Sequence, residues 1–208
     1  MSTDAMTQPI GDGLDADATL AALTERFSVE RDPQDKWGLS VIVQADQLRE
    51  LVGFLRYDER LCYDMLVDVT AVDYLAYPAW RGARYAVVYL FKSLVLNHRI
   101  KLKVFVEEGE EAIPSIHDIY KIANWTEREV WDQYGIVFDG HPNLKRILNH
   151  HEFVGHPLRK DYPVQKRQHL SINDPMLDEL TARLRQLGFS IIDHEATTPS
   201  GQDPEGAA

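Results

Sequence analysis

Three segments in the middle of the chain alternate apolar and polar residues with the two-residue period of a β-strand. In 99–106, four aliphatic residues fall on one face and three basic residues on the other. Segment 63–72 places the apolar side chains of positions 65, 67, 69 and 71 on one face, and 85–94 is apolar on both faces. An apolar run on both faces is typical of an interior strand, so we expect 85–94 to lie between two other strands.

The links between these segments are short. The residues at 77–82 and at 97–98 suit antiparallel hairpins. Segment 38–44 also alternates, and it predicts a further strand upstream.

Residues with helical spacing lie before and after these strands. Segment 17–27 predicts a first helix, and Asp46 predicts the N-cap of a second. A third helix is predicted just after Pro114, with an apolar stripe that reaches Ala123. The run 126–129 has the spacing of a capping box and predicts a short helix that ends at Gly135. This order of elements predicts an α+β fold, a mostly antiparallel sheet with helices packed on it.

The segment from 140 to 163 shows no periodicity, and prolines and glycines interrupt it throughout. A stretch of this length without regular structure is usually functional in a compact domain. A last helix is predicted from Asp174-Pro175 to Gly188. The predicted parts are a flexible leader (1–16), an α+β domain (17–140), an extended basic strap (141–170), a C-terminal helix (171–193) and a disordered tail (194–208).

The net charge of −11 argues against a general nucleic-acid binder. This charge is unevenly spread. The strap holds six Lys or Arg and two acids, a net charge of +4, whereas the remainder holds 16 bases and 31 acids, a net charge of −15. One basic segment therefore belongs to an otherwise acidic protein.

A single cysteine, Cys62, excludes an internal disulfide, a self-contained iron–sulfur cluster and a zinc site of paired cysteines. The apolar runs are far shorter than the roughly 20 residues of a membrane helix. The first twenty residues contain four Asp and no Lys or Arg, unlike a signal or transit peptide. We therefore expect a protein that stays on the cytosolic side and does not span a membrane.

Four histidines of the strap, His141, His150, His151 and His156, raise the question of a metal site. No cysteine accompanies them, and no helix motif presents two of them on one face. We therefore interpret them as loop or interface histidines and expect no metal.

Three carboxylates, Glu127, Glu129 and Asp132, are the candidates for acid–base chemistry. The first two would stand in the first helical turn, where acids favour the helix dipole, and Asp132 is four residues from Arg128, the spacing of an ion pair. These roles explain the acids without a substrate. The sequence also contains no established nucleotide loop or nucleophile motif, so we expect no catalytic and no cofactor-binding residue.

The strap carries the basic pair Arg159-Lys160 between Pro157 and Pro163, which hold the backbone in an extended path. Its backbone groups need hydrogen-bond partners, and we expect an acidic groove on another protein to supply them. The pattern therefore predicts a strap that docks on a partner protein.

Two blocks of motifs overlap this region. The first contains NWTERE at 124–129, then Asp132 and GIVFDGHP at 135–142; the second contains LKRIL at 144–148 and GHPLRKDYP at 155–163. Together they closely resemble the C subunit of NADH-quinone oxidoreductase, the respiratory complex I or NDH-1, although loop 149–152 departs from that family's acidic spacer. The residues that carry the motif, and that the resemblance assigns to interfaces with other subunits, are Glu127, Arg128, Glu129, Asp132, Gly135, Gly140, His141, Pro142, Arg146, Leu148, Gly155, His156, Pro157, Leu158, Arg159, Lys160, Asp161, Tyr162 and Pro163.

The resemblance implies a structural subunit in the peripheral arm, without a cofactor of its own. FMN and iron–sulfur clusters would lie in partner subunits of a translocase that passes electrons from NADH to a quinone. The expected partners are chiefly the D subunit, and also the B, I and H subunits. The expected location is the cytoplasmic side of the bacterial inner membrane, as a peripheral membrane protein.

Other classes of protein remain as alternatives. One is the equivalent subunit of a membrane-bound hydrogenase or formate hydrogenlyase. A second is a module that binds RNA or protein through its basic strap, and a third is an unrecognised hydrolase that uses His and Asp.

Overall fold

The structure is a computed structural model that describes residues 16–33, 35, 38–78, 80–109, 112–165 and 175–189. The chain divides into two compact units, 1–168 and 169–208. The elements of the first unit are α1 (Ala16–Thr24), β1 (Val29–Arg31), β2 (Leu39–Val43), α2 (Ala45–Tyr57), β3 (Met65–Asp73), β4 (Tyr85–Lys92), β5 (Arg99–Val106), β6 (Ala112–Pro114), α3 (Ala123–Tyr134) and β7 (Val137–Asp139).

The second unit contains α4 (Pro175–Gln186), which begins at the predicted proline. Gly188, the predicted stop, has a positive φ of 80°. The predicted tail and all of the predicted leader except Ala16 lie outside the described residues.

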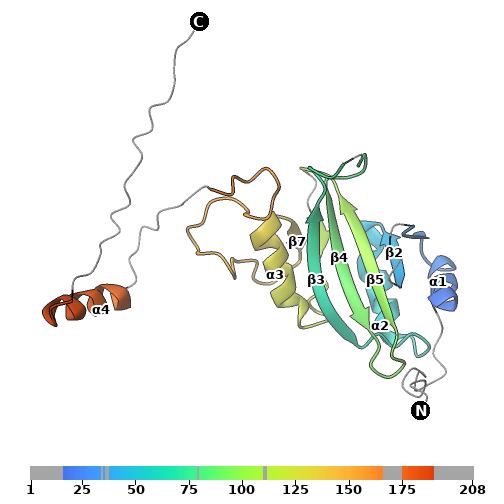
Figure 1. Cartoon of the computed structure of the whole chain (residues 1–208). Coiled ribbons are helices and arrows are strands. Elements are labelled where there is room, and N and C mark those ends of the chain that lie inside the picture. Colours follow the sequence, from blue (N-terminus) through green and yellow to red (C-terminus); the bar gives the residue numbers. More distant parts are fainter. Residues whose placement is uncertain are drawn as a thin grey trace, which may run out of the picture. The chain divides into compact units, whose positions relative to one another are not determined.

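A five-stranded sheet in the order β1-β2-β5-β4-β3 is the centre of the first unit (Figure 1). β4 pairs antiparallel with β3 and with β5, as the two short links predicted. β2 and β5 run parallel, so the sheet is mixed. The predicted α+β class is confirmed.

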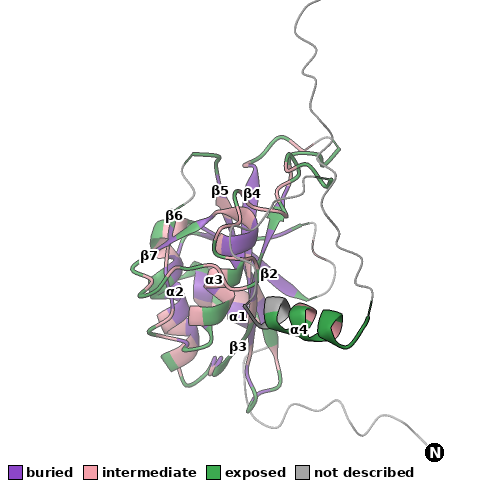
Figure 2. Ribbon diagram, turned by 90° about the vertical axis from the view of Figure 1, so that its left-hand side faces the viewer, coloured by how far each residue is buried: buried purple, intermediate pink, exposed green. Residues whose placement is uncertain are grey.

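Helices cover one face of this sheet. Figures 1 and 2 show α2 and α3 on the same side, with the buried residues gathered between the helices and the strands. The apolar residues Leu48, Leu51, Val52 and Leu55 of α2 are fully buried, and the inward face of β5 is buried from Ile100 to Val106. The amphipathic patterns in the sequence therefore positioned the core correctly.

The start of β3 departs from the predicted pattern. A β-bulge lies between Leu66 and Asp68, and an extra residue in a strand reverses the alternation of its side chains. Leu66 is therefore buried, whereas Met65 and Val67 are 39% and 43% exposed on the opposite face. After the bulge Val69 faces the core as predicted.

No helix forms at 115–122, contrary to the prediction. β6 pairs with β7, and the Ser115 amide extends this pairing by donating to the Asp139 carbonyl at 2.8 Å. The next residues form turns, in which Ile116 and Tyr120 are buried in the core. The apolar stripe is real, but turns rather than a helix present it. The short strands β1, β6 and β7 were not predicted, because three residues are too few to show a period.

The predicted helix starts at Thr126 and Asp46 are also wrong. α3 begins at Ala123, so Thr126 lies inside the helix, and its buried hydroxyl has no hydrogen-bond partner within the described structure. In α2 the N-cap position belongs to Gln44, which places Asp46 in the first turn. The end of α3 is as predicted, since Gly135 takes the left-handed conformation with φ 82°.

Candidate functional site

A buried carboxylate near the end of α3 holds the beginning of the strap. Asp132 is fully buried and accepts hydrogen bonds from the amides of Ile147, Leu148 and Asn149 at 3.0, 2.9 and 2.9 Å. The side-chain amide of Asn149 donates to it at 3.0 Å, and the Arg146 guanidinium forms an ion pair with it. We call these residues the Asp132 clamp. It fixes a loop that has no regular structure of its own.

The clamp keeps Asp132 ionised. Burial alone would raise the pKa of this carboxyl, but the hydrogen bonds from Asn149, Arg146 and Ile147 lower it to about 2. The predicted pairing of Asp132 with Arg128 is not formed. Arg128 instead donates to the carbonyls of Lys145 and Arg146, each at 2.9 Å. Helix α3 therefore holds the strap through two side chains, the Asp132 carboxylate and the Arg128 guanidinium.

Arg146 closes the loop that follows. Its second terminal nitrogen donates to the Gly155 carbonyl at 2.9 Å, and the guanidinium lies over the rings of Trp131 and Phe153. Planar stacking together with forked donation is a role that lysine cannot fill. Loop 149–152, which departs from the family pattern, thus contributes Asn149 to a defined structure.

The second half of the strap satisfies the carboxyl end of α3. The last carbonyls of a helix have no partner within the helix. Here His156 donates to the Asp132 carbonyl at 3.1 Å and the Leu158 amide to the Gln133 carbonyl at 3.1 Å, while Arg159 donates to the Tyr134 carbonyl. A cation at this position also suits the negative end of the helix dipole.

Gly135 allows this close approach. A Cβ atom at this position would lie 2.5 Å from Arg159 and 2.7 Å from His156. We expect Gly135→Ala to lower the free energy of unfolding by about 2 kcal/mol, from backbone strain and displaced side chains. Urea unfolding would measure the loss. Gly140→Ala is the control, because Gly140 also has a positive φ of 78° but a Cβ added there would meet no atom within 4 Å. Equal losses in both variants would contradict the role of close contact.

A second anchor joins the strap to the sheet. Asp73 at the end of β3 and Arg84 before β4 form an ion pair at 3.1 Å, with side chains 0% and 8% exposed. The Lys160 amide donates to Asp73 at 2.8 Å, and the Asp161 carboxylate pairs with Arg84 at 2.7 Å. We call these four residues the Arg84 junction. It ties β3, β4 and the strap at one place.

The strap therefore folds on its own domain over 141–165, the part that the structure describes. The expectation that another protein must satisfy its backbone is wrong for the amides of Ile147, Leu148, Asn149 and Lys160, because they have partners in this chain. Docking on a partner does not follow from unsatisfied backbone groups. A docking surface on the strap must instead consist of side chains that remain exposed.

Glu127 lies in a third buried cluster. It is fully buried inside α3, not in the first turn, and it accepts hydrogen bonds from the Ile116 amide at 2.8 Å and from the Ser115 hydroxyl. His141 Nε2 is 4.0 Å from its carboxylate. Burial raises the pKa of Glu127 to about 7, although these hydrogen bonds lower it in part. Its role is to hold the turn after β6 against α3, and Glu129, by contrast, is exposed.

The raised pKa of Glu127 predicts a pH effect. Between about pH 4.5 and 7 the folded chain holds a proton that the unfolded chain has lost, so stability falls as pH rises through this range. We expect a loss on the order of 2 to 3 kcal/mol from this group, absent in Glu127→Gln. Unfolding at several pH values would measure it, with Glu129→Gln as the exposed control. An unchanged pH slope in Glu127→Gln would contradict this assignment.

The motif histidines are dispersed. His141 Nε2 donates to the Asn124 carbonyl at 3.1 Å, and His156 donates to the Asp132 carbonyl of α3. The rings of His150 and His151 contact each other with centroids 4.1 Å apart and planes tilted by 39°. Among the described residues no group of three His, Cys, Asp or Glu side chains could hold a metal ion.

The sequence did not predict Asp73, Arg84 or Ser115 as site residues, and Ser115 was expected only at the start of the helix after Pro114. Each contacts a residue of the motif region that is 12 to 87 positions away in the chain. Nothing in their local pattern distinguishes them from ordinary strand-end residues. Only the pairing of β3 with β4, and of β6 with β7, brings them to the strap and to α3.

The family model described as "Respiratory-chain NADH dehydrogenase, 30 Kd subunit" matches residues 41–168. The chain is 45% identical over 129 residues to the C subunit of NADH-quinone oxidoreductase from Cupriavidus taiwanensis, covering 61% of this chain and 65% of that protein. It is 46% identical over 126 residues to the C subunit from Caulobacter vibrioides, covering 61% of each.

Solved structures agree with this result. "Nqo5 of the trypsin-resistant fragment (1-134) in P63 form" shares 31% identity and a TM-score of 0.52, covering 61% of this chain and 96% of that one. A chain of an archaeal membrane-bound sulfane sulfur reductase has a TM-score of 0.58 over 92% of this chain and 98% of its own, but at 21% identity it supports the fold alone.

The chain belongs to the family of the 30 kDa subunit of respiratory-chain NADH dehydrogenase, whose curated bacterial relatives are named as the C subunit of NADH-quinone oxidoreductase. The match spans less than two thirds of the length of both relatives named above. The matched range contains the Asp132 clamp and the Arg84 junction in full. No helix in the described ranges has the length and apolar content needed to cross a membrane.

Proposed function

We propose that this chain is a cofactor-free structural and assembly subunit in the peripheral arm of a proton-translocating NADH-quinone oxidoreductase. Family membership supports the kind of complex. In this proposal the electrons pass from NADH through FMN and iron–sulfur clusters of other subunits to quinone. This chain contributes a docking surface and no active site of its own.

The clamped strap is the observation that carries the proposal. Within the strap, Arg146 and Asn149 bind Asp132, and Asp161 pairs with Arg84. The apolar side chains of Leu148, Val154 and Leu158 are 63%, 67% and 49% exposed. Large apolar side chains that an ordered loop leaves exposed can bury that area against a partner protein. A loop already fixed by buried hydrogen bonds loses little conformational entropy on binding. This arrangement supports a preformed docking surface.

The partners in this proposal are the other peripheral-arm subunits, chiefly the D subunit and also the B, I and H subunits. Contact with the membrane would be made only through the complex, on the cytoplasmic side of the inner membrane. The acidic net charge argues against the RNA-binding alternative.

Affinity purification tests the proposal. The chain is tagged, the complex is extracted with a mild detergent, and the subunits, flavin and iron that co-purify are measured. We expect flavin- and cluster-containing subunits, and we expect Leu148→Glu with Leu158→Glu to reduce their recovery at least about tenfold, because two charges would be buried in an apolar interface.

Tyr57→Glu is the control, since Tyr57 is 71% exposed at the end of α2, outside the strap. Recovery without flavin or clusters would contradict the proposed complex. Recovery of a hydrogenase large subunit instead would support that alternative. Unchanged recovery in the double variant would contradict the strap as the docking surface.

A further inference from the structure

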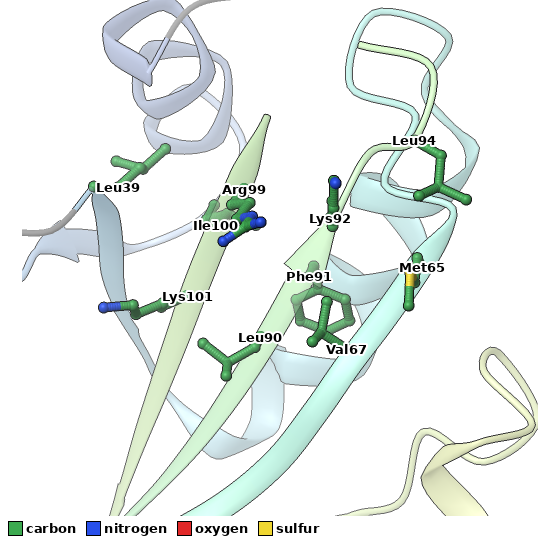
Figure 3. A pocket seen from close by; sticks show the side chains of 11 residues that line it. Leu39, Met65, Val67, Leu90, Phe91, Lys92, Leu94, Arg99, Ile100 and Lys101 are labelled. Atoms are coloured by element: carbon green, nitrogen blue, oxygen red, sulfur yellow. The ribbon is translucent and has the colours of Figure 1, made fainter. Parts of the chain in front are cut away.

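The sheet face opposite α2 and α3 carries a cavity of about 490 Å³. It lies outside the family motif and plays no part in the docking surface proposed above. Side chains from three neighbouring strands project into it: Met65 and Val67 from β3, Leu90 and Lys92 from β4, and Arg99 and Lys101 from β5 (Figure 3).

The floor of this cavity is apolar. The β-bulge in β3 leaves Met65 and Val67 exposed beside Leu90, and Leu94 on the following turn is 57% exposed. An uncovered apolar patch on an ordered sheet indicates an interaction site. The bulge creates this patch, because without it Met65 and Val67 would lie on the same face as Val69 and point into the core.

Two cations stand at one end of the floor. Lys92 and Arg99 are directly opposite each other in the β4–β5 register. Like charges in this position destabilise a sheet. Lys101 on the same face is paired with Asp35 at 2.6 Å, but the ion pairs of the described residues include no acidic partner for Lys92 or Arg99. The cost of this pair would be offset by an anionic group bound at this end.

The acidic charge of the rest of the chain indicates where an acidic ligand can bind. The net charge is −11, so an acidic partner is repelled by most of the surface and attracted where unneutralised cations occur. The apolar floor requires apolar side chains next to those acids. A segment with carboxylates at one end and apolar side chains along one face satisfies both requirements, as an acidic amphipathic helix does.

We infer that this face binds an acidic amphipathic helix of a neighbouring protein in the complex, whose carboxylates pair with Lys92 and Arg99 and whose apolar side chains lie on Met65, Val67 and Leu90. The inference rests on the proposed function, because that neighbour would belong to the same complex. It adds a second docking surface on the opposite face of the sheet from α3.

Photocrosslinking in the assembled complex tests this surface. A benzophenone side chain replaces Val67 in the tagged full chain, the purified complex is irradiated, and the crosslinked peptide is identified by mass spectrometry. We expect one peptide of a partner subunit, with Asp or Glu and apolar residues at helical spacing. Lys92→Glu with Arg99→Glu should reduce the crosslink at least about tenfold, and replacing the partner's acids with lysine should restore it.

Arg81→Glu with Lys121→Glu is the matched control, because both residues are exposed and the change of charge is the same. A crosslink to lipid, to this chain itself or to a segment without acids would overturn the inference, as would a yield that charge reversal leaves unchanged. If the chain co-purifies with the complex and Val67 gives no partner crosslink, only this inference fails. If the chain does not co-purify, the proposed function fails with it.

Discussion

Replacement of Asp132 with asparagine is expected to lower the free energy of unfolding by about 3 to 5 kcal/mol, the cost of leaving one member of a buried ion pair alone. The Arg146 side chain is 13% exposed and would lose its only described carboxylate. The new amide group would also present hydrogens to the amides of Leu148 and Asn149, which now donate to the carboxylate. The strap should detach from α3 before the rest of the fold unfolds.

Two measurements separate the local effect from the global one. Urea unfolding reports the loss of stability, and limited trypsin digestion reports cleavage after Lys145 and Arg146, which detachment would accelerate. Glu129→Gln is the control, because it makes the same chemical change at an exposed position of the same helix. If Asp132→Asn cleaved no faster than Glu129→Gln, the clamp would not be what holds the strap.

The clamp also predicts the response to acid. The pKa of Asp132 is lowered in the folded chain to about 2, so its contribution is fully present above the unfolded pKa of about 4 and is lost as pH falls toward 2. This direction is opposite to that of Glu127, whose raised pKa makes stability fall as pH rises. Two carboxylates of one helix thus set the pH range in which the site is most stable: Asp132 sets the acidic limit and Glu127 the alkaline limit.

Replacement of Arg84 with methionine is expected to cost a similar amount, about 3 to 5 kcal/mol, because Asp73 would remain buried without a cation. Arg84 also pairs with Asp161, so the variant should free the end of the strap from the sheet. Burial opposes ionisation of Asp73, but hydrogen bonds from Arg84 and the Lys160 amide lower its pKa on balance. In the variant that pKa should rise.

Chemical denaturation and the NMR titration of the Asp73 carboxyl would measure both effects. Arg81→Met is the matched control, since Arg81 is an exposed arginine of the same hairpin that donates only to the adjacent Trp80 carbonyl among the described contacts. Arg84→Lys keeps the charge but loses the fork that contacts several acids, so we expect an intermediate loss. A full loss in Arg81→Met would contradict the assignment to the junction.

The sequence predicted the elements that are long enough to show a period. The strand at 99–106 and the apolar stripe of α2 were placed correctly, because burial on one face requires a regular spacing of apolar residues. The predictions failed where tertiary contacts, rather than the local sequence pattern, fixed the start of a helix or the partner of a side chain. The capping box at Thr126 has the right spacing, yet the helix begins three residues earlier. Glu127, expected in the first turn, lies farther along the helix and accepts hydrogen bonds from Ser115 and Ile116.

The candidate site likewise combines residues that the sequence identified with partners that only the tertiary structure shows. The motif residues Asp132, Arg146 and Arg159 were identified from the sequence, but their partners were not. Asp132 was expected to pair with Arg128 four residues away, whereas its contacts lie 14 to 17 positions along the chain. Asp73 and Arg84 were not identified at all, because a pair that forms across a hairpin has no short-range signal.

Periodicity, charge and motif spacing are local properties of the chain, so an α+β domain with a basic, irregular strap and the motifs of its family could be predicted from the sequence alone. The tertiary structure decided what the strap does. It folds back on α3 and the sheet, since one buried carboxylate and the unpaired carbonyls of a helix end supply the partners that its backbone and its arginines need. This folding also decides which apolar side chains of the strap stay exposed for a partner. The order of residues in the sequence does not contain that information.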